Sequence, residues 1–378
     1  MANILDYLAH RFDTFDEVPF GPVDALVLSE FCMTELGGIL DEIPHAATRA
    51  DPERASRLFA IRQRDADLRF CDFLRAEHYD TMFTGFTESE SKACLEGLAA
   101  SPRFRTMRIR SYRSVFDSGK HLQFAATAFS YGDLFTFVGF RGTDATIAGW
   151  REDFDMAFAY PVPAQTEARR FLEQVVARVP RSCKAIYVGG HSKGGNLAVH
   201  AAMNLPAALQ ERITQVFDND GPGFRKGVLP AHSPLYSRIR KTVPRGSIVG
   251  MLLDSPVKPH VVESSAHGFM QHSGFTWQID GYDFAYLDEL SDKAMTTKRI
   301  LDSWLAKCTD EEKRAFVGVL FDTLEASGAD RFPDLTADWK TTLPLMMSAL
   351  GKKDPNKDLA WRATMAFGDA VRDELGRR

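Results

Sequence analysis

The sequence predicts a mixed α/β fold around a mostly parallel sheet, and three observations lead to this prediction. Short apolar runs alternate with helix-like segments in the middle of the 378-residue chain, which is the pattern of β-α-β units. Two β-rich runs, at residues 122–130 and 134–140, flank a glycine-containing turn and indicate one antiparallel hairpin beside the parallel strands. The patterns at both ends of the chain, before about residue 100 and after about residue 290, are helical.

The expected elements divide the chain into three parts. Residues 1–100 are expected to form a helical segment that packs on or caps the core, because apolar residues suit a helix face and residues 55–74 alternate apolar and charged residues at helical spacing. Residues 291–378 are expected to form a helical C-terminal extension. Residues 101–290 are expected to form the core. After the hairpin we expect a helix at 166–179, a buried strand at 185–188 and a second helix at 196–209, followed by strands at 213–217, 247–253 and 257–262.

Composition and charge restrict the possible functions. The net charge of −5 is small for this length, so no strong attraction to nucleic acid or to an acidic lipid surface is expected. The five cysteines are scattered without a C-x-x-C pair, which predicts neither a metal site nor a disulfide framework, and no cofactor is expected. We find no secretory signal and no run of about 18 apolar residues, so we expect a cytoplasmic protein without a transmembrane segment.

The most informative segment reads AIYVGGHSKGGNLAVH and covers residues 185–200. Its glycines flank Ser192 in the pattern G-x-S-x-G, with a strand-like run before it and a helix-like run after it. This context is typical of a nucleophile elbow, in which a serine is held on a sharp turn and its neighbours lack side chains because the strand and the helix pass close together. The segment predicts an α/β-hydrolase fold and makes Ser192 the candidate nucleophile.

A second motif precedes the elbow. Residues 136–144 read TFVGFRGTD, and residues 149–154 read GWREDF. In these two segments the chain resembles the class 3 lipases, whose oxyanion strand ends in F-R-G-[ST] and is followed by a D-W-x-x-D-like segment. The resemblance implies that the backbone N–H of Thr143 is one oxyanion donor. The second donor is expected to be the N–H of Lys193, the residue after the nucleophile.

Five motifs also make the chain similar to a bacterial hydrolase-like family that is labelled a domain of unknown function. The motifs are NILDYL, GHSKGGNLA, DGPGF, SIVGMLL and a QHxxxxW pattern, at residues 3–8, 190–198, 220–224, 247–253 and 271–277. The similarity covers roughly residues 1–290 and implies a lipase-like hydrolase fold, but it implies no particular substrate.

The general base is expected downstream of the nucleophile, because hydrolases of this fold order their triad as serine, acid and histidine. Three histidines meet this condition: His260, His267 and His272. His272 is the first choice, because Trp277 follows it by five residues as in the lipase pattern, and His267 is the fallback.

Two aspartates are candidates for the acid. The class 3 lipase resemblance implies an acid where this chain has Ser247, and a serine cannot stabilise an imidazolium as a carboxylate does. Asp220 ends the strand after the one that carries the elbow, similar to the arrangement in the pancreatic-lipase group, and it is preferred to Asp254. Asp254 follows the run 247–253, which is the more usual location in the wider fold. Asp is also common in Asp-Gly-Pro-Gly turns for local reasons, and that is the competing interpretation of Asp220.

These residues predict a serine hydrolase that cleaves a carboxylic ester through an acyl-enzyme, with a small-molecule ester or lipid-like substrate. In this hypothesis His272 accepts the proton of Ser192, Asp220 orients His272, and Thr143 and Lys193 stabilise the oxyanion. Two alternatives stay open: a thioesterase or peptidase with the same triad, and a hydrolase-like binding protein with weak or no turnover.

Overall fold

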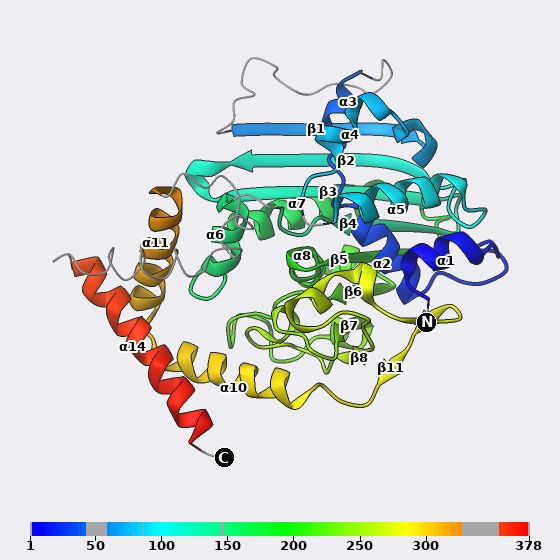
Figure 1. Cartoon of the computed structure of the whole chain (residues 1–378). Coiled ribbons are helices and arrows are strands. Elements are labelled where there is room, and N and C mark those ends of the chain that lie inside the picture. Colours follow the sequence, from blue (N-terminus) through cyan, green and yellow to red (C-terminus); the bar gives the residue numbers. More distant parts are fainter. Residues whose placement is uncertain (1, 43–58, 86, 145–146, 327–354, 377–378) are drawn as a thin grey trace.

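The computed structural model describes residues 2–42, 59–85, 87–144, 147–326 and 355–376. Its centre is a nine-stranded sheet with the strand order β1-β2-β3-β4-β5-β6-β7-β8-β11 (Figure 1). Strands β4 to β8 run parallel to one another, and the remaining neighbours are antiparallel. The predicted fold class is therefore confirmed: a mixed α/β fold with a mostly parallel central sheet and flanking helices, as in the lipase-like α/β-hydrolases.

The parallel half of the sheet carries the candidate site. It consists of β4 (Phe135–Phe140), β5 (Ala185–His191), β6 (Gln215–Asn219), β7 (Ile239–Pro244) and β8 (His260–Val262). Gly190 of β5 is paired with Phe140 of β4 on one side and with Asp218 of β6 on the other. The carboxyl ends of these three strands therefore lie next to one another, and polar residues that follow them meet at one edge of the sheet.

The antiparallel half contains β1 (Phe59–Leu68), β2 (Arg108–Asp117) and β3 (Leu122–Tyr131). Strands β3 and β4 form the expected hairpin. The expectation of a helix over residues 55–74 is wrong for residues 59–68, because they pair with β2 almost throughout, and residues 70–73 form a short 3-10 helix. The sequence pattern did not predict β2 either. The open edge of β2 offers β1 a row of backbone hydrogen bonds, and such tertiary pairing outweighs a weak local helix pattern.

Helices cover both faces of the sheet, because successive strand side chains point to opposite faces and both faces are apolar. In β5, Tyr187 packs against the N-terminal layer, whereas Ile186 and Val188 pack against the opposite layer. The N-terminal layer contains α1 (Ile4–His10), α2 (Pro22–Phe31), α3 (Gly37–Glu42), α4 (Tyr79–Met82) and α5 (Glu88–Ala100). The opposite layer contains α7 (Pro163–Arg178), α8 (Lys193–Met203) and α9 (Ala207–Gln210).

Local sequence signals explain where several of these helices begin. The Asn3 side chain accepts hydrogen bonds from the N–H groups of Leu5 and Asp6, and the Asp6 carboxylate accepts one from Asn3 N–H, which is a complete capping box. Helices α2 and α7 both begin with proline, at Pro22 and Pro163, where the missing N–H has no intrahelical partner to lose.

A buried ion pair attaches the N-terminal layer to the core. Arg103 Nε and Nη2 donate to the two carboxylate oxygens of Asp24 in α2, at 2.8 and 2.7 Å. The Tyr7 hydroxyl of α1 donates to the same carboxylate at 2.8 Å. The Arg103 and Asp24 side chains are 0% and 1% exposed, so each charge depends on the other for compensation.

The C-terminal helices extend from the parallel side of the sheet (Figure 1). They are α10 (Asp292–Lys307), α11 (Asp310–Ala326) and α14 (Pro355–Leu375), and α11 packs against α6 (Ile147–Asp155) through Phe321 and Phe154. The part of the expected helical extension at residues 327–354 lies outside the described residues. No helix in the described ranges is both long enough and apolar enough to span a membrane.

One expectation about the end of the core is wrong. Residues 247–253 form a turn with a short 3-10 helix at Val249–Met251 in place of a strand. Short strands also continue beyond the expected last strand: β9 (Ile279–Asp280) pairs with β10 (Asp283–Phe284), and β11 (Tyr286–Leu287) pairs with β8. The physical reason for the turn at 247–253 is the buried carboxylate of Asp220, which accepts hydrogen bonds from this segment.

Candidate active site

Ser192 lies on a sharp turn between β5 and α8. Its backbone has φ 57° and ψ −134°, a conformation that non-glycine residues rarely adopt. The Ser192 N–H donates to the carbonyl of Asn219 at 2.9 Å, which fixes the turn to β6. A Cβ on Gly190 would lie within 3.0 Å of Gly194 backbone atoms, and a Cβ on Gly195 within 3.0 Å of the Asp218 carboxylate. Gly190 of the G-x-S-x-G pattern, and Gly195 directly after the pattern, are therefore required by the close approach of α8 to β5 and β6.

The end of β4 runs close to this turn. A Cβ on Gly194 would clash with the carbonyl oxygen of Phe140, and a Cβ on Gly142 would lie 3.3 Å from Ser192 Cβ. Thr143 follows directly after Gly142. Lys193 is the first residue of α8, so its N–H is one of those at a helix start that have no intrahelical partner. Both backbone segments that carry the expected oxyanion donors thus lie near the serine, at the positive end of the α8 dipole.

A buried polar network joins these two segments. The Thr143 hydroxyl donates a short hydrogen bond to Asp153 Oδ2, and Lys193 Nζ lies 3.8 Å from Asp153 Oδ1. Lys193 Nζ also donates to Glu152 Oε2 at 2.8 Å, and both of these side chains are 0% exposed. Burial raises the pKa of Asp153 to about 6, with Lys193 and Thr143 acting in the opposite direction. For Lys193, burial lowers the pKa, but Glu152 and Asp153 together raise it above its usual value.

Asp220 and His272 face each other although they are far apart in sequence. His272 Nδ1 lies 2.6 Å from Asp220 Oδ2. The Asp220 side chain is fully buried and the His272 side chain is 18% exposed, so the pair spans from the interior to the surface. Because Nδ1 is engaged by the carboxylate, the Nε2 atom of His272 is the ring nitrogen left for a reacting group.

The other oxygen of Asp220 explains the turn at residues 247–253. Ser247 Oγ donates to Asp220 Oδ1 at 2.5 Å, and the Gly250 N–H donates to the same atom at 3.1 Å. A Cβ on Gly250 would overlap this oxygen, so only glycine fits there. Ser247, at the position where the lipase resemblance implies an acid, therefore contacts the carboxylate that comes from β6. Sequence reasoning missed this role, although the absence of an acid at 247 together with the DGPGF motif was a usable signal.

The remaining candidates lie elsewhere. Asp254 is exposed, and its backbone pairs with Phe224 across the DGPGF segment. His267 is exposed at the start of the 3-10 turn before His272, and His260 lies at the start of β8 with its ring 5.8 Å from that of Tyr286. Within the described residues neither histidine contacts Asp220 or Asp254 by a hydrogen bond.

No hydrogen bond joins the Ser192 hydroxyl to His272 in the part of the chain that the structure describes. Catalytic hydrogen bonds of this type are often long in ligand-free proteins and tighten only when a substrate binds. The same described ranges contain no group of three or more His, Cys, Asp or Glu side chains that could hold a metal ion.

Another buried ion pair supports the DGPGF turn. Lys241 Nζ of β7 donates to Asp218 Oδ2 at 2.8 Å and to the carbonyl of Gly221 at 2.5 Å, and the Gly221 N–H donates to Asp218 Oδ1 at 2.9 Å. Burial raises the pKa of Asp218, while Lys241 acts to lower it. Asp220 itself has φ 53°, so the turn that presents its carboxylate is held in the left-handed region.

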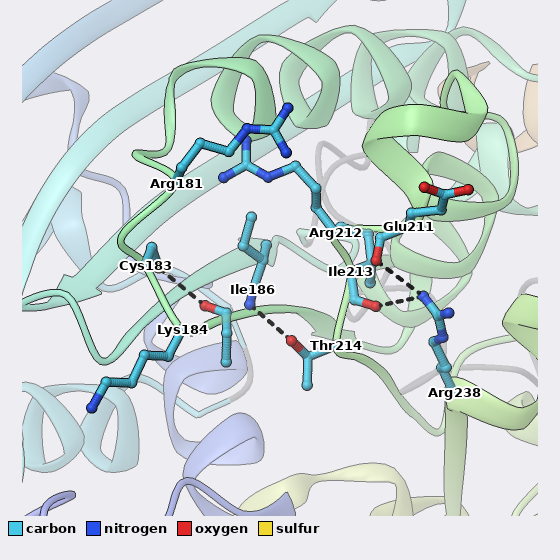
Figure 2. A pocket seen from close by; sticks show the side chains of 10 residues that line it. Arg181, Cys183, Lys184, Ile186, Glu211, Arg212, Ile213, Thr214 and Arg238 are labelled. Atoms are coloured by element: carbon cyan, nitrogen blue, oxygen red, sulfur yellow. Dashed lines mark hydrogen bonds between the residues drawn. The ribbon is translucent and has the colours of Figure 1, made fainter.

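A cavity of about 410 Å³ lies at the opposite edge of the sheet, around the amino ends of β5 and β6 (Figure 2). Two of its arginines bind backbone carbonyls. Arg212 donates to the carbonyls of Val176 and Val179 at the end of α7, and Arg238 donates to that of Ile213. Arg212 thus compensates the negative end of α7, and both arginines have a structural role distant from Ser192.

The fold, with a strained serine turn at the carboxyl ends of parallel strands, is of the lipase-like α/β-hydrolase type. A family model described as Mbeg1-like matches residues 98–322, more than half of the chain, and the chain belongs to this family.

Among solved structures, the chain is similar to the native Rhizomucor miehei lipase propeptide complex, with 18% sequence identity and a TM-score of 0.30. That similarity covers 42% of this chain and 57% of the lipase chain, so it spans little more than half of the solved structure. No curated protein matches the chain.

Proposed function

We propose that this protein is a serine hydrolase that cleaves carboxylic esters through an acyl-enzyme on Ser192. The observation that carries the proposal is the 2.6 Å contact between His272 Nδ1 and the fully buried carboxylate of Asp220, at the same sheet edge as the strained serine turn. A buried carboxylate on Nδ1 stabilises the tautomer whose Nε2 is free to accept a proton, and it stabilises the imidazolium that results.

In the proposed reaction Ser192 Oγ attacks the ester carbonyl carbon while His272 Nε2 accepts the hydroxyl proton. The carbonyl oxygen becomes an oxyanion, which accepts hydrogen bonds from the N–H groups of Thr143 and Lys193. His272 then donates its proton to the departing alkoxide as the C–O bond breaks, which releases the alcohol and leaves an acyl-serine. A water molecule repeats the sequence and releases the acid.

The surface beside His272 supports an apolar ester as substrate. Phe269 and Met270 are 48% and 54% exposed, and the Phe269 ring lies 5.8 Å from the His272 ring. Exposed apolar side chains of this size next to a reacting group provide contact area for an acyl chain or an apolar alcohol. Thioester and peptide substrates use the same chemistry, and parallel assays with the three bond types separate them.

The test is covalent labelling of the full-length protein with a fluorophosphonate, followed by intact-mass measurement and an assay with p-nitrophenyl butyrate. One adduct and measurable hydrolysis are expected, and Ser192→Ala should abolish both. Ser265→Ala, which changes an exposed serine, serves as the matched control. A wild-type protein that is neither labelled nor active would contradict the proposal and favour a hydrolase-like binding protein.

A further inference from the structure

His191 precedes Ser192 in the chain, and the reaction proposed above gives it no part. It is the last residue of β5, and its side chain is 9% exposed. Its Nε2 atom lies 2.7 Å from the backbone carbonyl oxygen of His272. A carbonyl oxygen only accepts hydrogen bonds, so Nε2 carries a hydrogen and donates it. This contact joins the strand that ends at the nucleophile to the backbone of the proposed base.

The other ring nitrogen of His191 faces a carboxylate from the N-terminal layer. Glu30 Oε1 of α2 lies 3.3 Å from His191 Nδ1, and the Glu30 side chain is 5% exposed. In the described part of the chain no hydrogen bond satisfies this oxygen, and the His191 ring is a polar group beside it. Burial lowers the pKa of His191 below its usual value, although Glu30 acts in the opposite direction. A lowered pKa favours the neutral ring, whose single hydrogen lies on Nε2 and is donated to the His272 carbonyl.

The segment after His272 also rests on α2. A Cβ on Gly274 would lie within 3.0 Å of Glu30 Oε1 and of Leu26 Cδ1, so the backbone of this segment is in tight contact with the helix. The same carboxylate oxygen is therefore adjacent both to the His191 ring and to the loop that carries His272. The His191 and His272 rings lie 4.7 Å apart with an angle of 33° between their planes.

We propose that His191 and Glu30 are positioning residues for His272. Glu30 contacts both the His191 ring and the loop, His191 holds the His272 carbonyl through a buried hydrogen bond, and the loop is thereby fixed relative to Ser192. The expected effect on turnover rests on the proposed hydrolase function, but the expected fixing of the His272 loop does not. The N-terminal layer then contributes directly to the geometry of the site, in addition to covering the sheet.

The test compares two variants of His191 that differ by one methylene group. The amide nitrogen of His191→Gln reaches the region of Nε2 and can donate to the His272 carbonyl, whereas the shorter amide of His191→Asn reaches only the region of Nδ1. Losing a hydrogen bond of this kind is expected to lower kcat by about ten- to a hundredfold in His191→Asn, with KM changed less than threefold. His191→Gln should exceed His191→Asn in kcat by about tenfold at equal thermal stability. Glu167→Gln, which removes a buried carboxylate paired with Arg113, is the control for loss of a buried charge.

A second measurement does not depend on turnover. The Nδ1 proton of His272 in its short bond to Asp220 should give a downfield proton NMR resonance in the wild type and in His191→Gln, and His191→Asn should broaden or lose it. An inactive wild type with this pattern would contradict the proposed function but support the positioning role. An unchanged kcat and an unchanged resonance in His191→Asn, or a wild type without the resonance, would overturn the positioning role.

Discussion

Replacing Asp220 by asparagine tests the proposed mechanism most sharply, because the structure determines how the new amide must point. Asp220 Oδ1 accepts hydrogen bonds from Ser247 Oγ and from the Gly250 N–H, so an acceptor must remain at that position. The amide oxygen therefore takes the place of Oδ1, and the amide NH₂ takes the place of Oδ2, 2.6 Å from His272 Nδ1. A donor there forces Nδ1 to be the unprotonated nitrogen, and the hydrogen moves to Nε2.

An imidazole with its hydrogen on Nε2 cannot accept the proton of Ser192. The same substitution in a serine protease costs about 10⁴ in kcat through the wrong tautomer, and we expect a loss on the order of 10² to 10⁴ here. This range corresponds to about 3 to 5 kcal/mol of transition-state stabilisation. Asparagine tolerates the left-handed backbone at position 220, where φ is 53°, so the fold should survive the change.

The assay is steady-state hydrolysis of p-nitrophenyl butyrate, with thermal denaturation midpoints measured for each variant. Asp254→Asn is the matched control, because Asp254 is exposed and follows the segment that the wider fold uses for its acid. Asp254→Asn should change kcat only slightly. The reasoning is refuted if Asp254→Asn is the inactive variant, or if Asp220→Asn keeps turnover within threefold while Ser192→Ala is inactive.

Three other perturbations test the fold and its buried charges. Gly194→Ala should destabilise the protein by about 1–3 kcal/mol or more in urea unfolding, because the new Cβ would clash with the backbone of β4. The control Gly318→Ala in α11, where a Cβ has no atom within 4 Å, should stabilise the protein by about 0.5–1 kcal/mol. Arg103→Met should cost about 3–5 kcal/mol, since it leaves the Asp24 carboxylate buried and uncompensated; a loss below 1 kcal/mol in the same measurement would contradict this. Asp153 binds its proton more tightly in the folded state, where its pKa is about 6 against a usual value of 3.8. The contribution of this proton to the free energy of unfolding is therefore complete below pH 3.8 and is lost as the pH rises through 6. The free energy of unfolding of Asp153→Asn relative to the wild type should therefore rise between pH 4 and pH 7, by up to about 3 kcal/mol, and a flat difference would count against the burial of this charge.

Much of the architecture could be predicted from the sequence because its signals are local. The glycines around Ser192, the apolar run before them and the hairpin at residues 122–140 each act over a few residues, and they predicted the fold class and the turn. Strand β1 and the turn at residues 247–253 were missed for the opposite reason. Residues 59–68 are extended because β2 offers a free edge, and Ser247 turns inward because a carboxylate from another strand needs donors.

The sequence by itself determined that a serine turn, an oxyanion-like strand and several possible acids and bases share one chain. Tertiary structure alone decided which of them meet: Asp220 and His272 are 52 residues apart, and Glu30 lies far from both along the chain. Local preferences act over a turn or two of backbone, whereas contacts between residues at the ends of different strands depend on sheet register and on loop paths across the sheet edge. For that reason the choice between Asp220 and Asp254 stayed open in the sequence, and the pairing of Glu30 with His191 had no sequence signal at all.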